Sequence, residues 1–423
     1  MRLLFLTPQL PYPPRQGAAI RNFNLIAHLA RHHTIDLITF TPNHFTETDY
    51  ETDYETDYET DDGPLTSLCR RIAVLPHPHS RLSARLRALI TSPLPDMAYR
   101  LESPAFHDQV VAWLADGDYD LVQVEGIELA QYMRHAAAAG IPTVFDNHNC
   151  EYLLQQRNAL SDLRSPRRWH GAAYSLVQWA KLRRYEAQVC RTARAVVAVS
   201  RPDAVALQNL APTADITIVP NAINLSDYPT LETRSTPTPG APFTVLFMGK
   251  MDYRPNVDAA LWFAGEVWPR VKRANPTAHW KIVGMNPHPR LAALAAQPDI
   301  EITGSVPDVR PFLTSADVFI IPMRVGGGTR LKALEAMASA KAVVSTSLGV
   351  EGIDVRHNRE LLIADTAQDF AAALHQLADD RAARGDLAHR LGNTARHFVA
   401  AHYTWPRMIP ILEDLYRRLR TTT

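Results

Sequence analysis

Residues 318–338 read VFIIPMRVGGGTRLKALEAMA and contain the strongest local signal in this chain of 423 residues. The run begins with short, apolar and mostly β-branched residues, which predict a buried strand over Val318–Pro322. Three consecutive glycines follow at 326–328, and then a helix is predicted over Arg330–Ser339. A strand, a glycine-rich turn and a helix in this order are typical of a doubly wound α/β domain.

The same alternation extends outward along the whole chain. In the first half, strands are predicted at Leu3–Thr7, Ile35–Phe40, Ile72–Leu75, Leu121–Val124, Thr143–Asp146 and Ala195–Ser200, with a helix at Ala18–Arg31. In the second half, strands are predicted at Thr244–Gly249, Trp280–Val283, Ile300–Thr303, Val318–Pro322 and Ala342–Thr346, with helices at Val257–Ala274, Pro289–Ala296 and Val306–Ser315. Short apolar runs separated by helices predict parallel sheets covered on both faces.

The expected architecture is therefore two doubly wound, Rossmann-like α/β domains facing across a cleft. We place the first domain at 1–223 and the second at 243–402. The Pro- and Thr-rich segment 224–242 has little to pack and is interpreted as a linker. The amphipathic end of the chain, 403–423, predicts a helix. In such folds ligands bind at the carboxyl ends of the strands.

Composition excludes several classes of protein. Lys plus Arg and Asp plus Glu number 44 each, so the net charge is zero, which argues against nucleic-acid binding. Residues 46–62 form an acidic E-T-D-Y repeat with no aliphatic side chain, which favours a solvated loop. Three dispersed cysteines indicate neither a disulfide framework nor a zinc site. No apolar run is long enough to span a membrane, so we expect a cytoplasmic protein.

The glycine turn has the chemistry of an anion site. Glycines allow close approach of a ligand to the backbone, and the start of a helix favours a phosphate. Arg324, Arg330 and Lys332 add positive charge, and Glu335, further along the helix, has the hydrogen-bonding capacity to hold a ribose diol. This combination suits a nucleoside diphosphate. The alternative is an ordinary strand–turn–helix junction with solvated charges.

The motif GGGTRLKALEAMA resembles the nucleotide-sugar motif of retaining glycosyltransferases of family 4 (group 1), which have the GT-B fold. The resemblance covers nearly the whole chain in the same order of segments. They are PYPPRQGAAIRNFNLIAHLA, FDNHNCEY, VSRPDA, IVPNAIN, VLFMGKMDYRPNVDA, IVGMNP, ITGSVPDVRPFLTSADVFIIP and TSLGVEGI.

The resemblance implies that the C-terminal helix within 403–423 packs back on the first domain. It also implies a role for each matching residue. Glu335 matches the glutamate that holds the donor ribose, whereas Gly327 stands where the family has a second glutamate at the sugar. Lys250 matches a diphosphate-binding cation, but Pro255 and Asn256 occupy the stretch of the next expected lysine, so Arg254, Arg330 or Lys332 is expected to replace it. The turn Gly328–Leu331 would bind the diphosphate, Gly304–Val306 the base, and Gly17 the phosphates. The implied donor-binding residues are Gly17, Lys250, Arg254, Gly304, Val306, Arg324, Gly326, Gly327, Gly328, Thr329, Arg330, Leu331, Lys332 and Glu335.

Polar residues at two strand ends of the first domain are the candidate catalytic groups. His148, in Asp146-Asn-His-Asn-Cys-Glu151, matches the family's active-site histidine, and Asp146 adjoins it. Glu125 ends a neighbouring predicted strand and is a candidate for orienting an acceptor hydroxyl. The alternative is a turn histidine beside a helix that Asp146 or Asn147 caps.

The implied reaction is transfer of a sugar, with retention, from a UDP- or GDP-type sugar to a glycan or lipid-linked acceptor, in cell-surface or exopolysaccharide synthesis. Cations and helix N–H groups stabilise the leaving diphosphate, so no metal and no cofactor are expected. We find no convincing nucleophile, which favours attack on the same face. A UDP-sugar epimerase-like enzyme and a non-catalytic nucleotide- or sugar-binding protein are the alternatives.

The segment Arg164–Arg194 holds eight basic residues and one acid, Glu186, with aromatic and aliphatic side chains between them. A basic helix with aromatic residues is typical of contact with an anionic membrane surface, here the cytoplasmic face of the inner membrane. The alternative, which we favour slightly, is a charged helix whose apolar side lies in the core.

Overall fold

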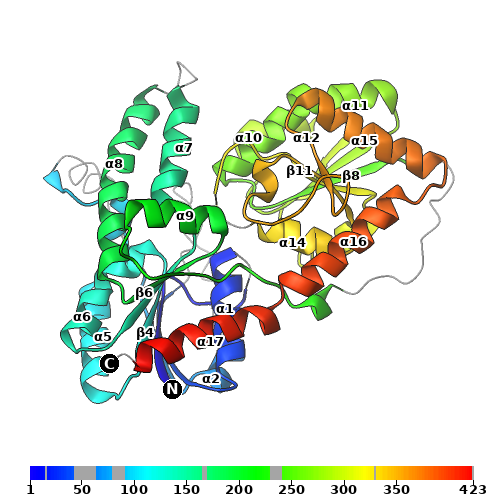
Figure 1. The fold of residues 1–423 in the computed structure, drawn as a ribbon. Helices are drawn as coiled ribbons and strands as arrows, with labels where there is room; N and C mark the ends of the chain where they lie inside the picture. The colour runs from blue at the N-terminus through cyan, green and yellow to red at the C-terminus, as the bar shows by residue number, and fades with distance from the viewer. Residues whose placement is uncertain are drawn as a thin grey trace, which may run out of the picture. The chain divides into compact units, whose positions relative to one another are not determined.

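The computed structural model describes residues 1–14, 17–41, 63–78, 91–163, 169–228, 241–327 and 330–421. The chain forms two compact units (Figure 1). Unit 1 comprises Met1–Pro220 and Trp405–Thr423, and unit 2 comprises Asn221–Thr404. The E-T-D-Y repeat, most of the expected linker, Gly328 and Thr329 lie outside the described residues.

Unit 1 is built on a seven-stranded sheet of order β3-β2-β1-β4-β5-β6-β7. Every pair of neighbouring strands is parallel. The strands are β1 (Arg2–Thr7), β2 (Thr34–Phe40), β3 (Arg71–Leu75), β4 (Leu121–Glu125), β5 (Thr143–Asn147), β6 (Ala195–Ala198) and β7 (Ile216–Ile218). The strands in the middle of the sheet are buried on both faces, which explains their continuous apolar runs.

The helices of unit 1 follow their strands in the chain and pack beside the sheet. They are α1 (Gly17–Leu29), α2 (Leu65–Leu68), α4 (Asp96–Tyr99), α5 (Pro104–Asp116), α6 (Met133–Ala138), α7 (Glu151–Leu163), α8 (Trp169–Thr192), α9 (Arg201–Leu210) and α17 (Trp405–Thr421), with a 3-10 turn at Ile127–Tyr132. Helices α7 and α8 lie side by side (Figure 1). The last helix, α17, packs along α1 (Figure 1), so the C-terminal helix belongs to the same unit as the N-terminal strand and helix.

Helix α8 contains most of the basic segment, and its two halves fit different interpretations of that segment. Leu182, Val189 and Cys190 are buried in the core of unit 1, as expected for a charged helix with an apolar inner side. Closer to its start, Tyr174 and Val177 are exposed. The core contacts therefore explain the second half of α8, and the exposed apolar residues of the first half require another explanation.

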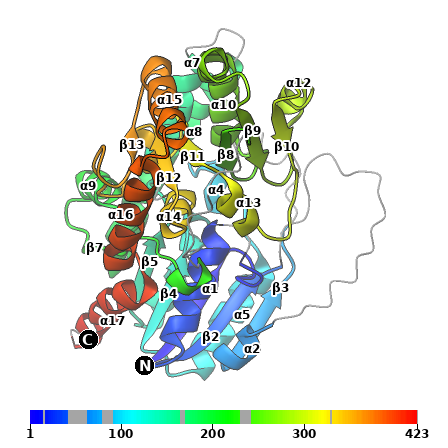
Figure 2. The same ribbon diagram turned by 90° about the vertical axis from the view of Figure 1, so that its right-hand side faces the viewer.

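Unit 2 repeats the design with a six-stranded parallel sheet of order β10-β9-β8-β11-β12-β13. The strands are β8 (Thr244–Met248), β9 (His279–Val283), β10 (Ile300–Ile302), β11 (Val318–Ile321), β12 (Ala342–Ser345) and β13 (Leu362–Ile363). The helices are α10 (Arg254–Trp262), α11 (Trp268–Ala274), α12 (Ala292–Ala295), α13 (Arg310–Ser315), α14 (Leu331–Ala338), α15 (Ala367–Ala382) and α16 (Leu387–His402). Helix α16 lies along α14 (Figure 2). The prediction of two Rossmann-like domains is confirmed.

Three local features differ from the sequence-based prediction. The helix expected at Val257–Ala274 begins at Arg254 and is interrupted by a π-helical segment at Phe263–Val267. The strands β7 and β13 were not predicted because they contain only three and two residues. In the segment interpreted as a linker, Leu225 and Tyr228 pack against the core of unit 2.

Glycines let the ends of β8 and β9 approach closely in unit 2. Gly249 and Gly284 follow these two strands, and a Cβ built on Gly284 would lie 1.7 Å from the carbonyl oxygen of Gly249. Gly284 also donates its N–H to the carbonyl oxygen of Gly304, at 3.2 Å. Three glycines therefore meet at the carboxyl edge of this sheet.

We predict that Gly284→Ala lowers the free energy of unfolding by about 2 to 3 kcal/mol, because its methyl group has no room beside the Gly249 backbone. Gly265→Ala is the matched control, since nothing lies within 4 Å of its added Cβ, and we expect a change of less than about 1 kcal/mol. Urea unfolding of the full chain measures both. Equal stability of the two variants would contradict the close approach.

Candidate functional site

The parallel pairing of β4 and β5 brings two carboxylates together in unit 1. Glu125 is the last residue of β4 and pairs in register with Asp146 of β5. Both side chains are fully buried. Burial raises the pKa of Asp146 to about 6, against the opposing charge of Arg21. Two acids this close in the interior need positive partners to remain ionised.

His148 is the partner of Glu125. Its Nε2 lies 2.6 Å from Oε2 of Glu125, and its side chain is 15% exposed. Burial lowers the pKa of His148, but the hydrogen bond and charge of Glu125 outweigh burial, so the pKa lies above its ordinary value. With Nε2 donating to the carboxylate, Nδ1 is the imidazole nitrogen left to meet a ligand. The structure therefore places the three predicted catalytic residues in one group.

Arg21 of α1 is the partner of Asp146, and the sequence analysis missed it. Its Nη2 lies 2.8 Å from Oδ2 of Asp146 and also donates to the carbonyl oxygen of Val219. The side chain is 2% exposed. No local pattern in the sequence distinguishes it from the other residues of α1. Because Asp146 is engaged by Arg21, it does not cap the following helix.

The cap of that helix comes instead from Glu186 of α8. Its carboxylate accepts the backbone N–H groups of Glu151 and Tyr152, at 3.1 and 2.8 Å, and the side-chain amide of Asn147, at 2.7 Å. These bonds fix both ends of the short loop that carries His148. The single acid of the basic segment is thus a structural residue of the site.

The atoms of Glu125, Asp146 and His148 lie within 4.8 Å of one another, a spacing that also suits a metal ion. Two features disfavour a cation here. The guanidinium of Arg21 already contacts Asp146, and Nε2 of His148 already bonds to Glu125. A cation would therefore compete with Arg21 for Oδ2 of Asp146 and with His148 for Oε2 of Glu125.

In unit 2, the candidate diphosphate cation is Lys332 near the start of α14. Its Nζ donates to Oδ1 of Asn256 at 2.8 Å, and Asn256 in turn donates to the carbonyl oxygen of Lys250. A Cβ on Gly249 would lie 2.8 Å from Nζ, so the ammonium stands beside the glycine that ends β8. Lys332 therefore occupies the neighbourhood of Asn256, in the stretch where the family pattern expects a lysine.

Burial strongly perturbs this lysine. It lowers the pKa of Lys332 to about 7, with a further contribution from the positive charge of Arg330. An anion at this position would reverse the effect by stabilising the ammonium. Such a perturbed lysine at the start of a helix is typical of a functional site.

Glu335 lies about one turn further along α14 and is held by Tyr228. The Tyr228 hydroxyl donates to Oε1 of Glu335 at 3.0 Å. Burial raises the pKa of Glu335, while the hydrogen bond from Tyr228 and the charge of Lys332 oppose this rise. The sequence analysis missed Tyr228 because it assigned this residue to the linker.

The other predicted donor residues are less closely grouped. Lys250 forms an ion pair with Asp252, and Arg324 one with Asp258, where its guanidinium also lies over the ring of Trp262. Arg330 packs beneath Gly326, since a Cβ on that glycine would lie 2.5 Å from the guanidinium. Gly304 and Gly326 have positive φ angles. Val306, Leu331, Arg254 and Gly327 belong to unit 2, Gly17 begins α1 in unit 1, and Gly328 and Thr329 lie outside the described residues.

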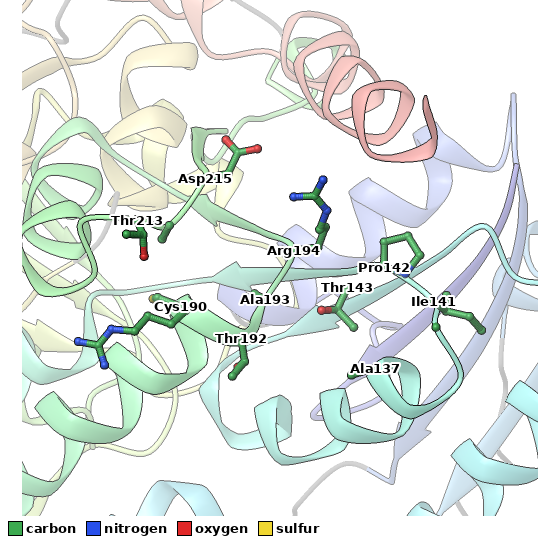
Figure 3. A pocket seen from close by; sticks show the side chains of 13 residues that line it. Ala137, Ile141, Pro142, Thr143, Cys190, Thr192, Ala193, Arg194, Thr213 and Asp215 are labelled. Carbon is green, nitrogen blue, oxygen red and sulfur yellow. The ribbon is translucent and has the colours of Figure 1, made fainter. Parts of the chain in front are cut away.

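A pocket of about 450 Å³ in unit 1 contains none of the predicted site residues. It is lined by Pro142 and Thr143 at the start of β5, and by Arg194, which precedes β6 (Figure 3). These residues lie at the amino ends of the strands, away from the edge where Glu125 and His148 gather. Ligands of doubly wound sheets bind at the carboxyl ends, so this pocket is not the candidate site.

Comparison with known proteins defines the class. Residues 15–227 match the model of Glycosyltransferase Family 4, and residues 242–380 match that of Glycosyl transferases group 1. The chain therefore belongs to glycosyltransferase family 4 and is a glycosyltransferase.

Solved structures agree on the fold, which is GT-B. Sucrose-phosphate synthase from Thermosynechococcus elongatus superposes with a TM-score of 0.71 at 17% identity, over 100% of both chains. The Anabaena protein HepE, in complex with UDP and glucose, superposes with a TM-score of 0.66 at 13% identity, over 98% of this chain and 99% of that one. At these identities the likeness concerns the fold.

One curated relative is more similar in sequence over a shorter stretch. It is a 44.6 kDa protein in the cps region of Klebsiella pneumoniae, 30% identical over 135 residues. The match covers 30% of this chain and about a third of that relative, 35% of its length.

We predict that Arg21→Met costs about 3 to 5 kcal/mol of stability at neutral pH, because it leaves the Asp146 carboxylate buried without a counter-charge. Protonation of Asp146 removes this penalty. Without Arg21 the pKa of Asp146 lies further above about 6, so the loss should shrink as the pH falls from alkaline values towards about 6 and should change no more below it. Urea unfolding at a series of pH values on both sides of 6 measures this. The exposed Arg31→Met is the matched control. A loss that does not change with pH would contradict the role of the pair.

Proposed function

We propose that this glycosyltransferase transfers a sugar, with retention of configuration, from a UDP- or GDP-type sugar to a glycan or lipid-linked acceptor. The observation that carries the proposal is the arrangement on α14. A half-buried lysine beside the glycine edge and a half-buried glutamate about one turn further on provide a cation for a diphosphate and a carboxylate for a ribose diol.

Each group of unit 2 has a part in binding the donor. Lys332 is already positioned by Asn256, so it need not be reoriented when the diphosphate arrives. The N-terminal end of α14 adds its dipole. Tyr228 holds one oxygen of Glu335, which leaves the other to accept hydroxyl groups of the ribose. Gly327 adds no carboxylate at the sugar, so other residues select the sugar.

The transfer step needs no covalent intermediate with the protein. The bond between the anomeric carbon and the diphosphate oxygen breaks through an oxocarbenium-like state, and the acceptor oxygen bonds to the same face of that carbon. The acceptor proton passes to the departing phosphate oxygen. Lys332 and the helix N–H groups stabilise the negative charge that develops on this oxygen.

His148 acts at the sugar and acceptor in this proposal. Its Nδ1 is available as a hydrogen-bonding group, and Glu125 holds the ring in place through Nε2. A protonated imidazole is favoured by the buried carboxylates around it. The cluster thus presents a directed donor to a hydroxyl or to the developing charge.

The exposed apolar side chains of α7 and α8 support a lipid-linked acceptor. Leu160 and Leu163 of α7 and Tyr174, Leu176 and Val177 of α8 are exposed. Exposed Arg183 and Arg184 lie further along α8, and basic residues beside apolar ones favour an anionic membrane surface. Among the helices that the structure describes, none combines the length and apolar character needed to cross a bilayer. The similarity to a protein of a cps region supports a role in surface-polysaccharide synthesis.

Thermal-shift measurements with UDP, GDP, ADP and TDP test the donor site. We expect one of these nucleotides to raise the melting temperature of the wild type, since a ligand of the folded state stabilises it by mass action. Glu335→Ala and Lys332→Met should lose the shift. Without nucleotide, Lys332→Met should melt no lower than the wild type, because it removes a buried group whose charge is unfavourable there.

Lys341→Met, which changes a lysine at the other end of α14, is the control and should keep the nucleotide shift. Absence of stabilisation by all four nucleotides at millimolar concentration would contradict the proposal. A positive result is followed by transfer assays with the matching nucleotide sugars.

We further predict that Leu176→Glu weakens sedimentation with vesicles of anionic phospholipid about tenfold or more, because it places a negative charge among the exposed apolar residues. Val205→Glu changes an apolar residue on α9 that is even more exposed, and it should have no effect. Wild-type protein that does not sediment with these vesicles would remove the support for a membrane-borne acceptor.

A further inference from the structure

A chain of buried hydrogen bonds leads from the last helix of unit 1 to the imidazole of His148. The Tyr416 hydroxyl, on α17, donates to Oε1 of Gln123 at 3.0 Å. The Nε2 group of Gln123, in β4, donates to Oε1 of Glu125 at 2.9 Å. Oε2 of Glu125 accepts from Nε2 of His148 at 2.6 Å. Tyr416, Gln123 and Glu125 are all fully buried.

The position of Tyr416 is itself fixed. Trp405, Leu412 and Leu415 of α17 are fully buried, which sets the face that the helix turns inward. One turn before Tyr416, Glu413 accepts hydrogen bonds from the rings of His32 and His33, at 2.9 and 3.2 Å. The hydroxyl of Tyr416 therefore reaches Gln123 from a rigid support.

We propose that Tyr416 of α17 and Gln123 of β4 are positioning residues for sugar transfer. They hold the Glu125 carboxylate, and through it the His148 imidazole, in a fixed orientation. The inference rests on the proposed function, in which His148 acts at the sugar and acceptor. It assigns to the C-terminal helix a role in the chemistry beyond packing.

The directions of the hydrogen bonds fix the orientation of the Gln123 side chain. A side-chain amide has a donor end and an acceptor end, and the Tyr416 hydroxyl selects the acceptor end of Gln123. The donor end must then face Glu125, where it holds Oε1 and leaves Oε2 for the imidazole. Without the hydroxyl, Oε1 of Gln123 is buried without this donor, and both amide orientations carry a cost. The carboxylate then loses the donor that holds Oε1, and its Oε2 contacts with His148 and with the amide of Asn22 are left to orient it.

Several charged groups face His148 and set the background for its titration. They are Glu125 of β4, Asp146 of β5 and Arg21 of α1. The carboxylate of Glu128 is in the same neighbourhood, since a Cβ built on Gly126 would lie 3.1 Å from its Oε2 and 3.9 Å from Nδ1 of His148. Tyr416 of α17 connects to them through Gln123. Replacement of Tyr416 by phenylalanine changes none of these charges, so it tests position alone.

The experiment compares Tyr416→Phe with Tyr132→Phe in the full-length protein. Tyr132 is also fully buried in unit 1, and its hydroxyl bonds to backbone groups of Leu101 and Ser103. Steady-state kinetics with the nucleotide sugar identified by thermal shift gives kcat and KM across pH. NMR of isotope-labelled histidine, assigned with His148→Gln, follows the imidazole directly.

For Tyr416→Phe we expect kcat to fall about tenfold with little change in the donor KM, because the imidazole is displaced while donor binding is retained. The titration midpoint of His148 should fall by roughly half a pH unit, since its bond to Glu125 weakens. Tyr132→Phe should leave both unchanged. Gln123→Met is the second variant and should reproduce the effect if Tyr416→Phe does not fold.

Unchanged kcat and an unchanged His148 titration in Tyr416→Phe would overturn the proposal. A loss of activity that matches the unfolded fraction, with no change of pH profile, would also overturn it, because packing alone then explains the residue. If the wild type transfers no sugar but the His148 titration still moves in Tyr416→Phe, the hydrogen-bonded chain stands and the proposed function fails.

Discussion

Two carboxylates that lie side by side in the interior of unit 1 constrain everything around them. Parallel pairing of β4 and β5 fixes Glu125 beside Asp146, and both are fully buried. Neither acid tolerates this position as an isolated charge. Arg21 therefore reaches Asp146 from α1, and His148 bonds to Glu125 from the loop after β5. The pairing of the strands thus buries two carboxylates that need positive or donating partners. One of these partners is the imidazole of His148, which is held at the carboxyl edge of the sheet with its Nδ1 available.

In unit 2 the candidate site is built around a cation. Gly249 and Gly284 directly follow β8 and β9, so the backbone itself forms the surface that a ligand would approach. The cation stands on α14 and reaches this surface through Asn256. Burial lowers the pKa of Lys332 to about 7, and an anion beside it would favour the charged ammonium. In the proposed function this half-buried lysine is the cation for the diphosphate.

The sequence predicts some parts of this arrangement much better than others. Apolar runs reveal the central strands, because strands buried on both faces of a parallel sheet have no polar side. The ends of those strands then point to Glu125, Asp146 and His148. Arg21, Tyr228 and Tyr416 remain hidden because their partners lie far away in the chain. Gln123 bonds to Glu125 two residues further along the same strand, but no local pattern distinguishes this contact. Tyr228 was obscured further by the prolines and threonines that follow it. Residues that position other residues follow no recognisable sequence pattern, so they can be identified only from the tertiary structure.

Three of the hidden residues have one property in common. Each bonds to a specific oxygen of a predicted residue: Arg21 to that of Asp146, Gln123 to that of Glu125, and Tyr228 to that of Glu335. Tyr416 acts one step further away, through Gln123. A carboxylate has two oxygens, and when the protein occupies one of them the other acquires a fixed direction. In Glu125 that second oxygen holds the imidazole. In the proposed function, the second oxygen of Glu335 accepts from the ribose diol of the donor. Preorganisation of this kind would lower the entropy lost when such a ligand is ordered, because the acceptor group is already held in place.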